Sequence, residues 1–325
     1  MTTVLVTGVG SVIGYGIIRS LRLRAAPCRI IGADIYPDAV GQAWTDAFEQ
    51  APYTRDPGYD AWLARVVAKH GVDVLVPGIE PDVFHANASR DFLAGLGVRC
   101  VLNRGELIEL SKDKWLQYQA LGQVGEDVRI PTALACDSAA FVARHGLPCL
   151  LKERCGSASK GLIRLARPED LAALGPAETD DTRLIQPIVG ADDAEYTVGV
   201  FGDGEGRARA TIAMRRTLSR AGATEKAHIV RDASLDAVID RLCAALRPLG
   251  PTNFQFRLAD GQWKLLEVNA RISASTSLRA AFGYNEASMA LDHVLTGILP
   301  EQPAVRDGFA VRYVADHVVY DRHHF

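Results

Sequence analysis

The sequence lacks the features that would tie it to a membrane, a nucleic acid or an oxidising compartment. No apolar stretch in its 325 residues approaches the roughly 18 that span a bilayer. A net charge of −3, a pI near 6.3 and the absence of a long basic run give no reason to expect nucleic acid. The six cysteines form no CxxC pair, so we expect reduced thiols and a cytoplasmic location. The apolar start is typical of a strand, a glycine turn and a helix, and we expect no leader peptide or membrane partner.

Strands and helices alternate in the first third of the chain. The segments TVLVTG, RIIGAD and VDVLVPG are apolar and β-rich. Between them lie amphipathic patterns, one of which carries Trp62, Leu63, Val66 and Val67 and stops at Gly71. This order predicts a parallel sheet with helices on its faces, placed at residues 1–110.

A glycine turn follows the first predicted strand. Gly8, Gly10 and Gly14 fit GxGxxxG, and Asp34 ends the second strand, which is the layout of a dinucleotide-binding fold. An NAD(P)-dependent oxidoreductase is therefore one alternative function. No tyrosine has a lysine four residues later, as a short-chain dehydrogenase would require. A tight turn that packs a helix closely on the sheet is the competing interpretation.

Three polar residues interrupt the apolar segment LLEVNARISAST. Glu267, Asn269 and Arg271 share one face of a strand, because side chains alternate with period two. Carboxylate and amide oxygens suit Mg²⁺, and an arginine can grip a phosphate. Gln255 on the preceding strand joins this face if the hairpin loop is odd, so we predict a three-residue loop at 259–261. A solvated hairpin face is the alternative for these residues taken alone.

A small-residue loop follows the strand that ends in Lys152. The loop, Gly156 to Gly161, leaves backbone N–H groups open to phosphate oxygens, and Lys152 can reach the same phosphates. It is not a P-loop, since GxxxxGK[ST] is absent. The tip of a flexible hairpin is the other interpretation.

Three segments, taken in order, resemble the ATP-grasp superfamily and its carbamoyl-phosphate-synthetase-large-subunit-like group. They are LLKERCGSASKGL, LIQPIVGADDAEYTVGV and NFQFRLADGQWKLLEVNARISASTSLRAAFGYNE, and the resemblance spans roughly residues 112–290. It implies an α/β protein in which two α+β subdomains clasp ATP, preceded by a Rossmann-like parallel domain. The implied domains are 1–110, a small lid subdomain at 111–187 with its leading helix, and a large subdomain with the metal site at 188–325. Glu153, Gln186 and Ala270 depart from residues common in the family.

The resemblance also implies roles for single residues. Lys152 and Arg271 would act on the transferred phosphate, and Gln255, Glu267 and Asn269 would hold one or two Mg²⁺, for which Mn²⁺ can substitute. Arg271 would also meet the substrate, together with Glu80, Ser275 and Thr276. The nucleotide would contact Lys114, Lys152, Gly156, Ser157, Ser159, Gly161, Gln186, Pro187, Val189 and Glu195.

Some charged residues stay open to two interpretations. Glu80 and Asp82 follow a strand of the first domain, where they could bind an amine or simply start a helix. Arg215, Arg216 and Lys226 could grip a carboxylate or lie in solvent.

The implied activity is ligation of a carboxylate to an amine. The acid would accept the ATP γ-phosphate to form an acyl phosphate, which the amine would attack with loss of phosphate. The expected partners are a small-molecule acid and amine. Many relatives dimerise, which leaves a homodimer open. A non-catalytic nucleotide-binding protein on the same fold is a further alternative.

Overall fold

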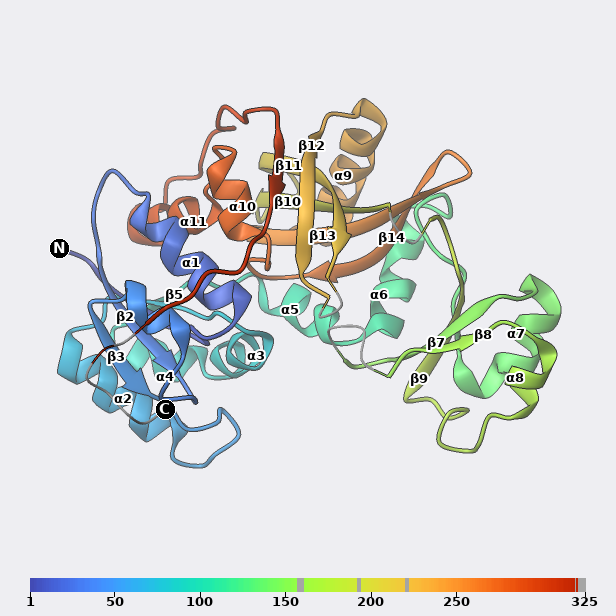
Figure 1. The fold of residues 1–325 in the computed structure, drawn as a ribbon, viewed down its shortest axis with the longest axis horizontal. Helices are drawn as coiled ribbons and strands as arrows, with labels where there is room; N and C mark the ends of the chain where they lie inside the picture. Colours follow the sequence, from blue (N-terminus) through green and yellow to red (C-terminus); the bar gives the residue numbers. More distant parts are fainter. Residues whose placement is uncertain (157–160, 192–193, 220–221, 319, 321–325) are drawn as a thin grey trace.

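The structure, a computed structural model, describes residues 1–156, 161–191, 194–219, 222–318 and 320. Three sheets succeed one another along the chain and give the molecule three lobes, with the smallest at one end (Figure 1). Within the described residues, no helix combines the length and apolar character needed to cross a membrane. The parallel N-terminal sheet and the two sheets that follow confirm the predicted mixed α/β class.

The first lobe holds a parallel five-stranded sheet in the order β3-β2-β1-β4-β5. Its strands are β1 (Thr3–Thr7), β2 (Arg29–Asp34), β3 (Ala47–Gln50), β4 (Val74–Val76) and β5 (Arg99–Cys100). Its helices are α1 (Val12–Arg22), the 3₁₀ helix η1 (Val40–Trp44), α2 (Tyr59–His70), α3 (Glu80–Ala88) and α4 (Arg90–Gly95). The strand order reverses between β1 and β4, so the carboxyl ends of these strands flank a switch point where ligands of open sheets bind.

The smallest lobe is a four-stranded antiparallel sheet in the order β6-β9-β7-β8. Its elements are β6 (Ala133–Leu134), η3 (Ala135–Asp137), α7 (Ser138–His145), β7 (Cys149–Glu153), β8 (Ile163–Leu165), α8 (Pro168–Ala172) and β9 (Arg183–Pro187). Phe141, Leu151 and Ile185 contribute to a core that belongs to this lobe alone.

The central lobe is a six-stranded antiparallel sheet in the order β14-β13-β10-β11-β12-β15. Its strands are β10 (Glu195–Asp203), β11 (Ala208–Leu218), β12 (Thr224–Val230), β13 (Leu249–Ala259), β14 (Gln262–Asn269) and β15 (Phe309–Val311). Its helices are α9 (Ala233–Leu246), α10 (Thr276–Ala281) and α11 (Glu286–Thr296). Asn285 caps α11 and Gly297 ends it in the left-handed conformation.

The segment between the first two lobes packs on the central sheet. It contains α5 (Gly105–Lys112), α6 (Lys114–Ala120) and η2 (Leu121–Gln123). Ile108 and Val128 share a core with Phe254 and Val268 of the central sheet. The domain boundaries at 110 and 187 stay predictions, because one core joins residues from both sides of them.

A capping carboxylate, and not Ser111, fixes the start of α6. Asp113 is the cap of α6, and its carboxylate accepts from the N–H groups of Trp115 and Leu116. Ser111 instead donates to the Ile108 carbonyl at the end of α5. The carboxylate of Asp113 also pairs with Arg154 at 2.7 Å, which ties the start of α6 to the end of β7.

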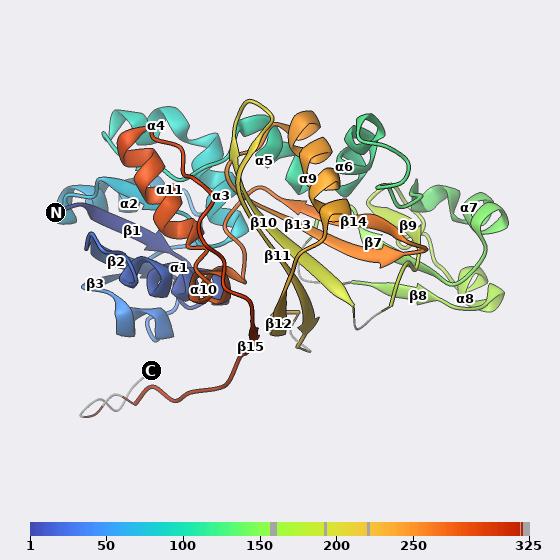
Figure 2. The ribbon, with the colours of Figure 1, turned by 90° about the horizontal axis from the view of Figure 1, so that it is seen from above.

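Two C-terminal helices pack against the N-terminal lobe, although nearly 200 residues separate them from it in sequence. Figure 2 shows α10 and α11 beside α1. Ala287 and Leu291 of α11 lie in one core with Ile17 of α1 and Val76 of β4. The first and central lobes are therefore joined by a continuous apolar core.

Candidate active site

The hairpin of β13 and β14 places Gln255 directly opposite Glu267, as predicted, but by a different device. The predicted three-residue loop is wrong. Asp260 and Gly261 form a two-residue turn with positive φ at both positions, and Ala259 pairs with Gln262.

A two-residue turn alone would put Gln255 and Glu267 on opposite faces of the hairpin, and a β-bulge brings them back to the same face. Phe256 pairs with Leu265 and Gln255 pairs with Glu267, so Leu266 is the extra residue. Leu265 and Val268 both enter the apolar core, with two residues between them instead of one. Gln255 and Glu267 therefore share the polar face that the sequence predicts.

The charges of Lys114 and Glu267 both act on Lys152. The pKa of Lys152 is lowered from its usual 10.5 to about 8, chiefly by burial and next by the positive charge of Lys114, while the negative charge of Glu267 opposes both effects. Lys114 reaches across from the start of α6 and donates to the Gly156 carbonyl. Within the part of the chain that the structure describes, neither the Lys152 nor the Glu267 side chain has a hydrogen-bond partner. Two cations and one carboxylate thus converge from three elements.

Gln255, Glu267 and Asn269 offer the oxygen donors that Mg²⁺ favours. Glu267 is unpaired among the described residues, and Asn269 is buried with its Nδ2 atom without a partner there. No described group of three or more His, Cys, Asp and Glu side chains is close enough to hold a metal by itself. One carboxylate and two amide oxygens fit a magnesium ion whose remaining ligands come from phosphate and water.

Arg216 of β11 is a member of this site that the sequence left undecided. It bonds Glu195 at 2.5 Å and 3.2 Å, both through Oε1, and its Nη2 donates to Gln255 Oε1 at 3.1 Å. Glu195, the predicted ribose ligand, is thus buried and paired with Arg216 through Oε1. Its Oε2 atom takes no part in these bonds. Arg215 is half-buried on the same strand, and Lys226 is exposed on β12. Alternation along β11 distinguishes Arg216 from Arg215, but only the strand pairing with β10 shows which of them meets Glu195.

Glu153 lies against both ends of the predicted phosphate loop. A Cβ on Gly156 would come within 2.6 Å of Glu153 Oε2, and one on Gly161, where φ is +68°, within 2.8 Å of Oε1. The two glycines leave room for this carboxylate, and Gly161 also has the left-handed φ that favours glycine. Ser157 and Ser159 fall outside the described residues.

The predicted adenine-binding segment begins at the end of β9, between β6 and β7 of the small sheet. Gln186 donates to Thr132 at 2.6 Å, and Pro187 pairs in register with Cys149. The Val189 carbonyl accepts from Arg257 at 3.2 Å. The segment connects β9 of the small lobe to β10 of the central lobe, which is the place that the resemblance implies for a hinge.

Arg271 joins the central sheet to the switch point of the first lobe. Its Nη2 contacts Glu80 Oε1 at 2.8 Å and Asn269 Oδ1 at 3.3 Å. Glu80 begins α3 directly after β4, so it reaches Arg271 from the other lobe. A shallow crevice beside this pair is lined by Pro77 and Arg271, among others. The structure brings together two residues predicted separately as substrate ligands.

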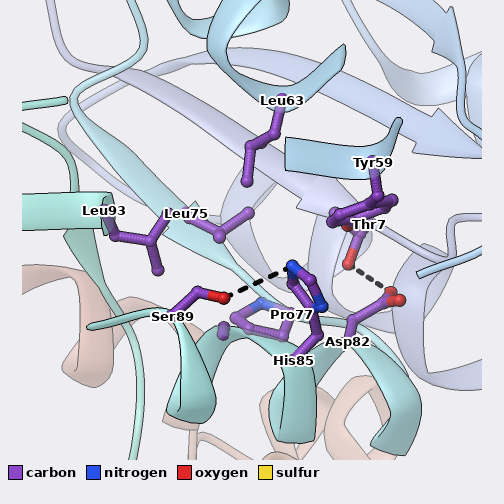
Figure 3. A pocket seen from close by; sticks show the side chains of 10 residues that line it. Thr7, Tyr59, Leu63, Leu75, Pro77, Asp82, His85, Ser89 and Leu93 are labelled. Atoms are coloured by element: carbon purple, nitrogen blue, oxygen red, sulfur yellow. Dashed lines mark hydrogen bonds between the residues drawn. The ribbon is translucent and has the colours of Figure 1, made fainter. Parts of the chain in front are cut away.

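Asp82 is engaged inside its own lobe. It lines a small hollow beside the ends of β1 and β4, where Thr7 donates to its carboxylate at 2.5 Å (Figure 3). Burial raises the pKa of Asp82 to about 6; the Thr7 hydrogen bond opposes this rise and the charge of Asp34 adds to it. Glu80, and not Asp82, therefore faces the central lobe.

Ser275 and Thr276 are fully buried where the chain leaves the metal strand. Ser275 shares a 3.0 Å hydrogen bond with Thr224, which also accepts from Arg216 at 3.2 Å. The Thr276 hydroxyl is buried without a partner among the described residues.

The N-terminal glycine turn is braced by Asp34. Its carboxylate accepts from the N–H groups of Gly10 at 2.7 Å and Tyr36 at 3.1 Å. Gly14 approaches the Gly8 carbonyl so closely that a Cβ there would lie 2.1 Å from it. These contacts support the interpretation of a tight turn that packs α1 on the sheet.

Comparison with known proteins finds a family match and a distant relative. Residues 182–317 match the family described as "ATP-grasp in the biosynthetic pathway with Ter operon". The carbamoyl phosphate synthase large chain of Methanosarcina mazei is 23% identical over 281 residues, which cover 74% of this chain and 25% of that relative. This chain thus spans about a quarter of that relative's length.

Solved structures share the fold at low identity. N5-carboxyaminoimidazole synthetase from Staphylococcus aureus, complexed with ADP, has a TM-score of 0.73 and 17% identity over 94% of this chain and 80% of that one. The biotin carboxylase domain dimer of 2-oxoglutarate carboxylase from Hydrogenobacter thermophilus, complexed with MgADP, ADP and bicarbonate, has a TM-score of 0.72 and 13% identity over 95% and 73%. The match of residues 182–317 to an ATP-grasp family and the fold shared with these structures agree with the resemblance to the ATP-grasp superfamily.

Proposed function

We propose that this protein is an ATP-dependent ligase that joins a carboxylate to an amine. The observation that carries the proposal is the convergence of Lys114, Lys152 and Glu267, with Arg271 held by Glu80 just after the end of β14. Phosphoryl transfer asks a protein mainly for positioning and for neutralisation of charge. This set of side chains supplies both.

The residues divide the work between the nucleotide and the metal. Lys114 and Lys152 would bind phosphate oxygens, and Glu195 would hold the ribose through its free Oε2. The metal ligands Gln255, Glu267 and Asn269 would hold one or two Mg²⁺, which Mn²⁺ can replace. The adenine would lie along Gln186, Pro187 and Val189, with the glycines at 156 and 161 near the phosphates.

The reaction has two steps. A carboxylate oxygen attacks the γ-phosphorus, the bond to the β-phosphate oxygen breaks, and ADP leaves with an acyl phosphate formed. An amine then attacks the acyl carbon, phosphate leaves with the bonding electron pair, and the amine loses a proton. Arg271 is placed to neutralise the transferred phosphate, and Glu80 holds Arg271 in position.

The partners in this proposal are small molecules, an acid and an amine, and the compartment is the cytoplasm, consistent with six free cysteines. The biotin carboxylase domain of 2-oxoglutarate carboxylase, which shares the fold, forms a dimer, and a homodimer is therefore an open alternative for this chain.

The test has a binding arm and a turnover arm. The full chain should be stabilised against heat by MgADP and should release ADP from ATP in mixtures of candidate acids and amines. Glu267→Gln should abolish release, while Glu301→Gln, an exposed glutamate, should behave as wild type. Equal release by the Glu267 variant would remove the metal assignment.

A non-catalytic nucleotide-binding protein is the second candidate, favoured by one contact. Arg216 already bonds both Glu195 and Gln255, so a cation lies where ribose and metal ligands meet. This candidate predicts MgADP binding with no ADP release in any acid and amine mixture.

A further inference from the structure

Arg312 is a half-buried cation with an unused donor. It follows β15, and its backbone N–H donates to the Glu225 carbonyl of β12 at 2.8 Å. The Nη2 atom donates to the Ala274 carbonyl. The Nη1 atom is buried and has no partner among the described residues. A buried donor without an acceptor is destabilising, and more so when it is charged.

The charged groups around Arg312 are mostly of its own sign. Burial lowers the pKa of Arg312; the hydroxyl of Tyr15 opposes this, and the positive charges of Arg19 and Arg216 add to it. Arg19 is exposed on α1, and in the described part of the chain it forms no ion pair. The negative charge of Glu195 neutralises the positive charge of Arg216. Among the described residues, the guanidinium groups of Arg19 and Arg312 are left without a carboxylate partner.

The cluster adjoins the proposed active site. Arg312 bonds the carbonyl of Ala274, whose neighbour Ser275 bonds Thr224, and Thr224 accepts from Arg216. On the other side α1 packs on α10, where a Cβ on Gly16 would lie 3.0 Å from Thr276 Cγ2. Figure 2 shows β12 and β15 meeting near α10, with α1 beside it.

We propose that Arg19 and Arg312, next to the Glu195-paired Arg216, form a binding site for an anionic oxyacid group of the substrate, a carboxylate or a phosphate. A planar guanidinium edge matches such a group with two parallel hydrogen bonds, which would give Arg312 Nη1 its missing acceptor. That the bound anion belongs to a substrate rests on the proposed function. It implies that the molecule carries a second acidic group besides the carboxylate that is phosphorylated.

The experiment measures stabilisation of the full chain by two simple probes, succinate and inorganic phosphate, in thermal unfolding. At least one anion should stabilise wild type, and the one that does identifies the group. In Arg312→Gln the apparent Kd should rise about tenfold or more, as expected on loss of a charge-assisted hydrogen bond. Arg231→Gln, which removes an exposed arginine paired with Asp307, should respond as wild type.

Two further variants separate this site from the nucleotide site and from misfolding. Lys152→Gln should keep the succinate response, because its lysine belongs to the nucleotide phosphates. Arg19→Gln changes an exposed side chain, so it should fold and still weaken the anion several-fold. If Arg312→Gln does not fold, Arg19→Gln alone tests the proposal.

Two results would overturn the proposal: no response of wild type to either anion, or an unchanged response in Arg19→Gln and in any folded Arg312→Gln. Stabilisation by MgADP is scored separately in the same samples. A chain that binds an anion but not MgADP would refute the proposed ligase and keep the anion site.

Discussion

Lys152 is the single residue whose protonation should control nucleotide binding near neutral pH. Its pKa is lowered to about 8, chiefly by burial and next by Lys114. Since phosphate binding needs the ammonium form, the apparent Kd for MgADP should rise about tenfold per pH unit above pH 8. Fluorescence titration between pH 7 and 9.5 measures this. Lys152→Arg, which does not titrate in that range, should show a flat profile, and a flat profile in wild type would contradict the assignment.

The lowered pKa of Lys152 affects folding stability and MgADP affinity in opposite directions as the pH rises. Below about pH 8 both the folded and the unfolded chain hold the Lys152 proton. Between pH 8 and 10.5 the unfolded chain binds more protons, so the Lys152 contribution to unfolding free energy rises with pH while MgADP affinity falls. Opposed slopes distinguish titration of this buried lysine from general alkaline unfolding.

Glu80 acts through Arg271 and is therefore expected to be a positioning residue. Glu80→Gln keeps the size of the side chain but removes the 2.8 Å ion pair. We expect kcat to fall about tenfold or more with MgADP affinity nearly unchanged, because a misplaced group loses rate more than binding. Asp82→Asn, two residues further along α3 and bonded to Thr7 instead, is the matched control for kcat. A fall in MgADP affinity equal to the fall in kcat would refute the positioning role.

At the scale of elements, the turn of the β13–β14 hairpin depends on backbone conformation alone. Gly261 has φ +72° and open space around its missing Cβ. Gly261→Ala should therefore lower unfolding free energy by about 1–2 kcal/mol through the left-handed backbone. Gly95→Ala, with equal space and an ordinary φ, should be neutral or slightly stabilising. Urea unfolding compares the two, and equal effects would contradict the two-residue turn.

A buried polar cluster fastens α10 and α11 to the strands behind the metal site. Arg279 and Glu286 are both fully buried, 3.1 Å apart, and Arg279 also donates to Thr197 and Asn253. Glu286→Gln leaves a buried charge unpaired and should lower unfolding free energy by about 3–5 kcal/mol.

The control for this cluster is an ion pair of the same kind in solvent. Glu205→Gln breaks the exposed pair with Arg247 and should change unfolding free energy by less than about 1 kcal/mol. Urea unfolding of both variants gives the comparison. Because Asn253 pairs in register with Asn269, MgADP binding should also weaken in Glu286→Gln. Equal stability of the two variants would exclude a structural role for the cluster.

The sequence predicts most elements and the chemistry of the site, because both are written in local patterns. Periodicity places α2, α11 and the hairpin strands, and the alternation of Glu267 and Asn269 points to a metal face. The bulge at Leu266 could not be predicted, since it is set by which side chains fit the core across the pair of strands. The pairing of Arg216 with Glu195, and of Glu80 with Arg271, depends on contacts between distant segments.

At the scale of the whole molecule, the three lobes differ in how they share their cores. The small lobe has its own core, whereas the first and central lobes share one through α11. Leu291, buried in that shared core, and Phe141, buried in the small lobe, are therefore a matched pair of probes.

Large-to-small changes at these two positions should spread differently through the molecule. Leu291→Ala should lower unfolding free energy by about 2–5 kcal/mol and speed hydrogen exchange in both β1 and β13, because their lobes open together. Phe141→Ala, with a cost of about 3–5 kcal/mol in its own core, should speed exchange only within residues 133–187. Since Lys152 lies in β7 of that lobe, Phe141→Ala should also weaken MgADP binding while the other two sheets stay protected. Faster exchange throughout the chain in both variants would mean that the small lobe does not open independently.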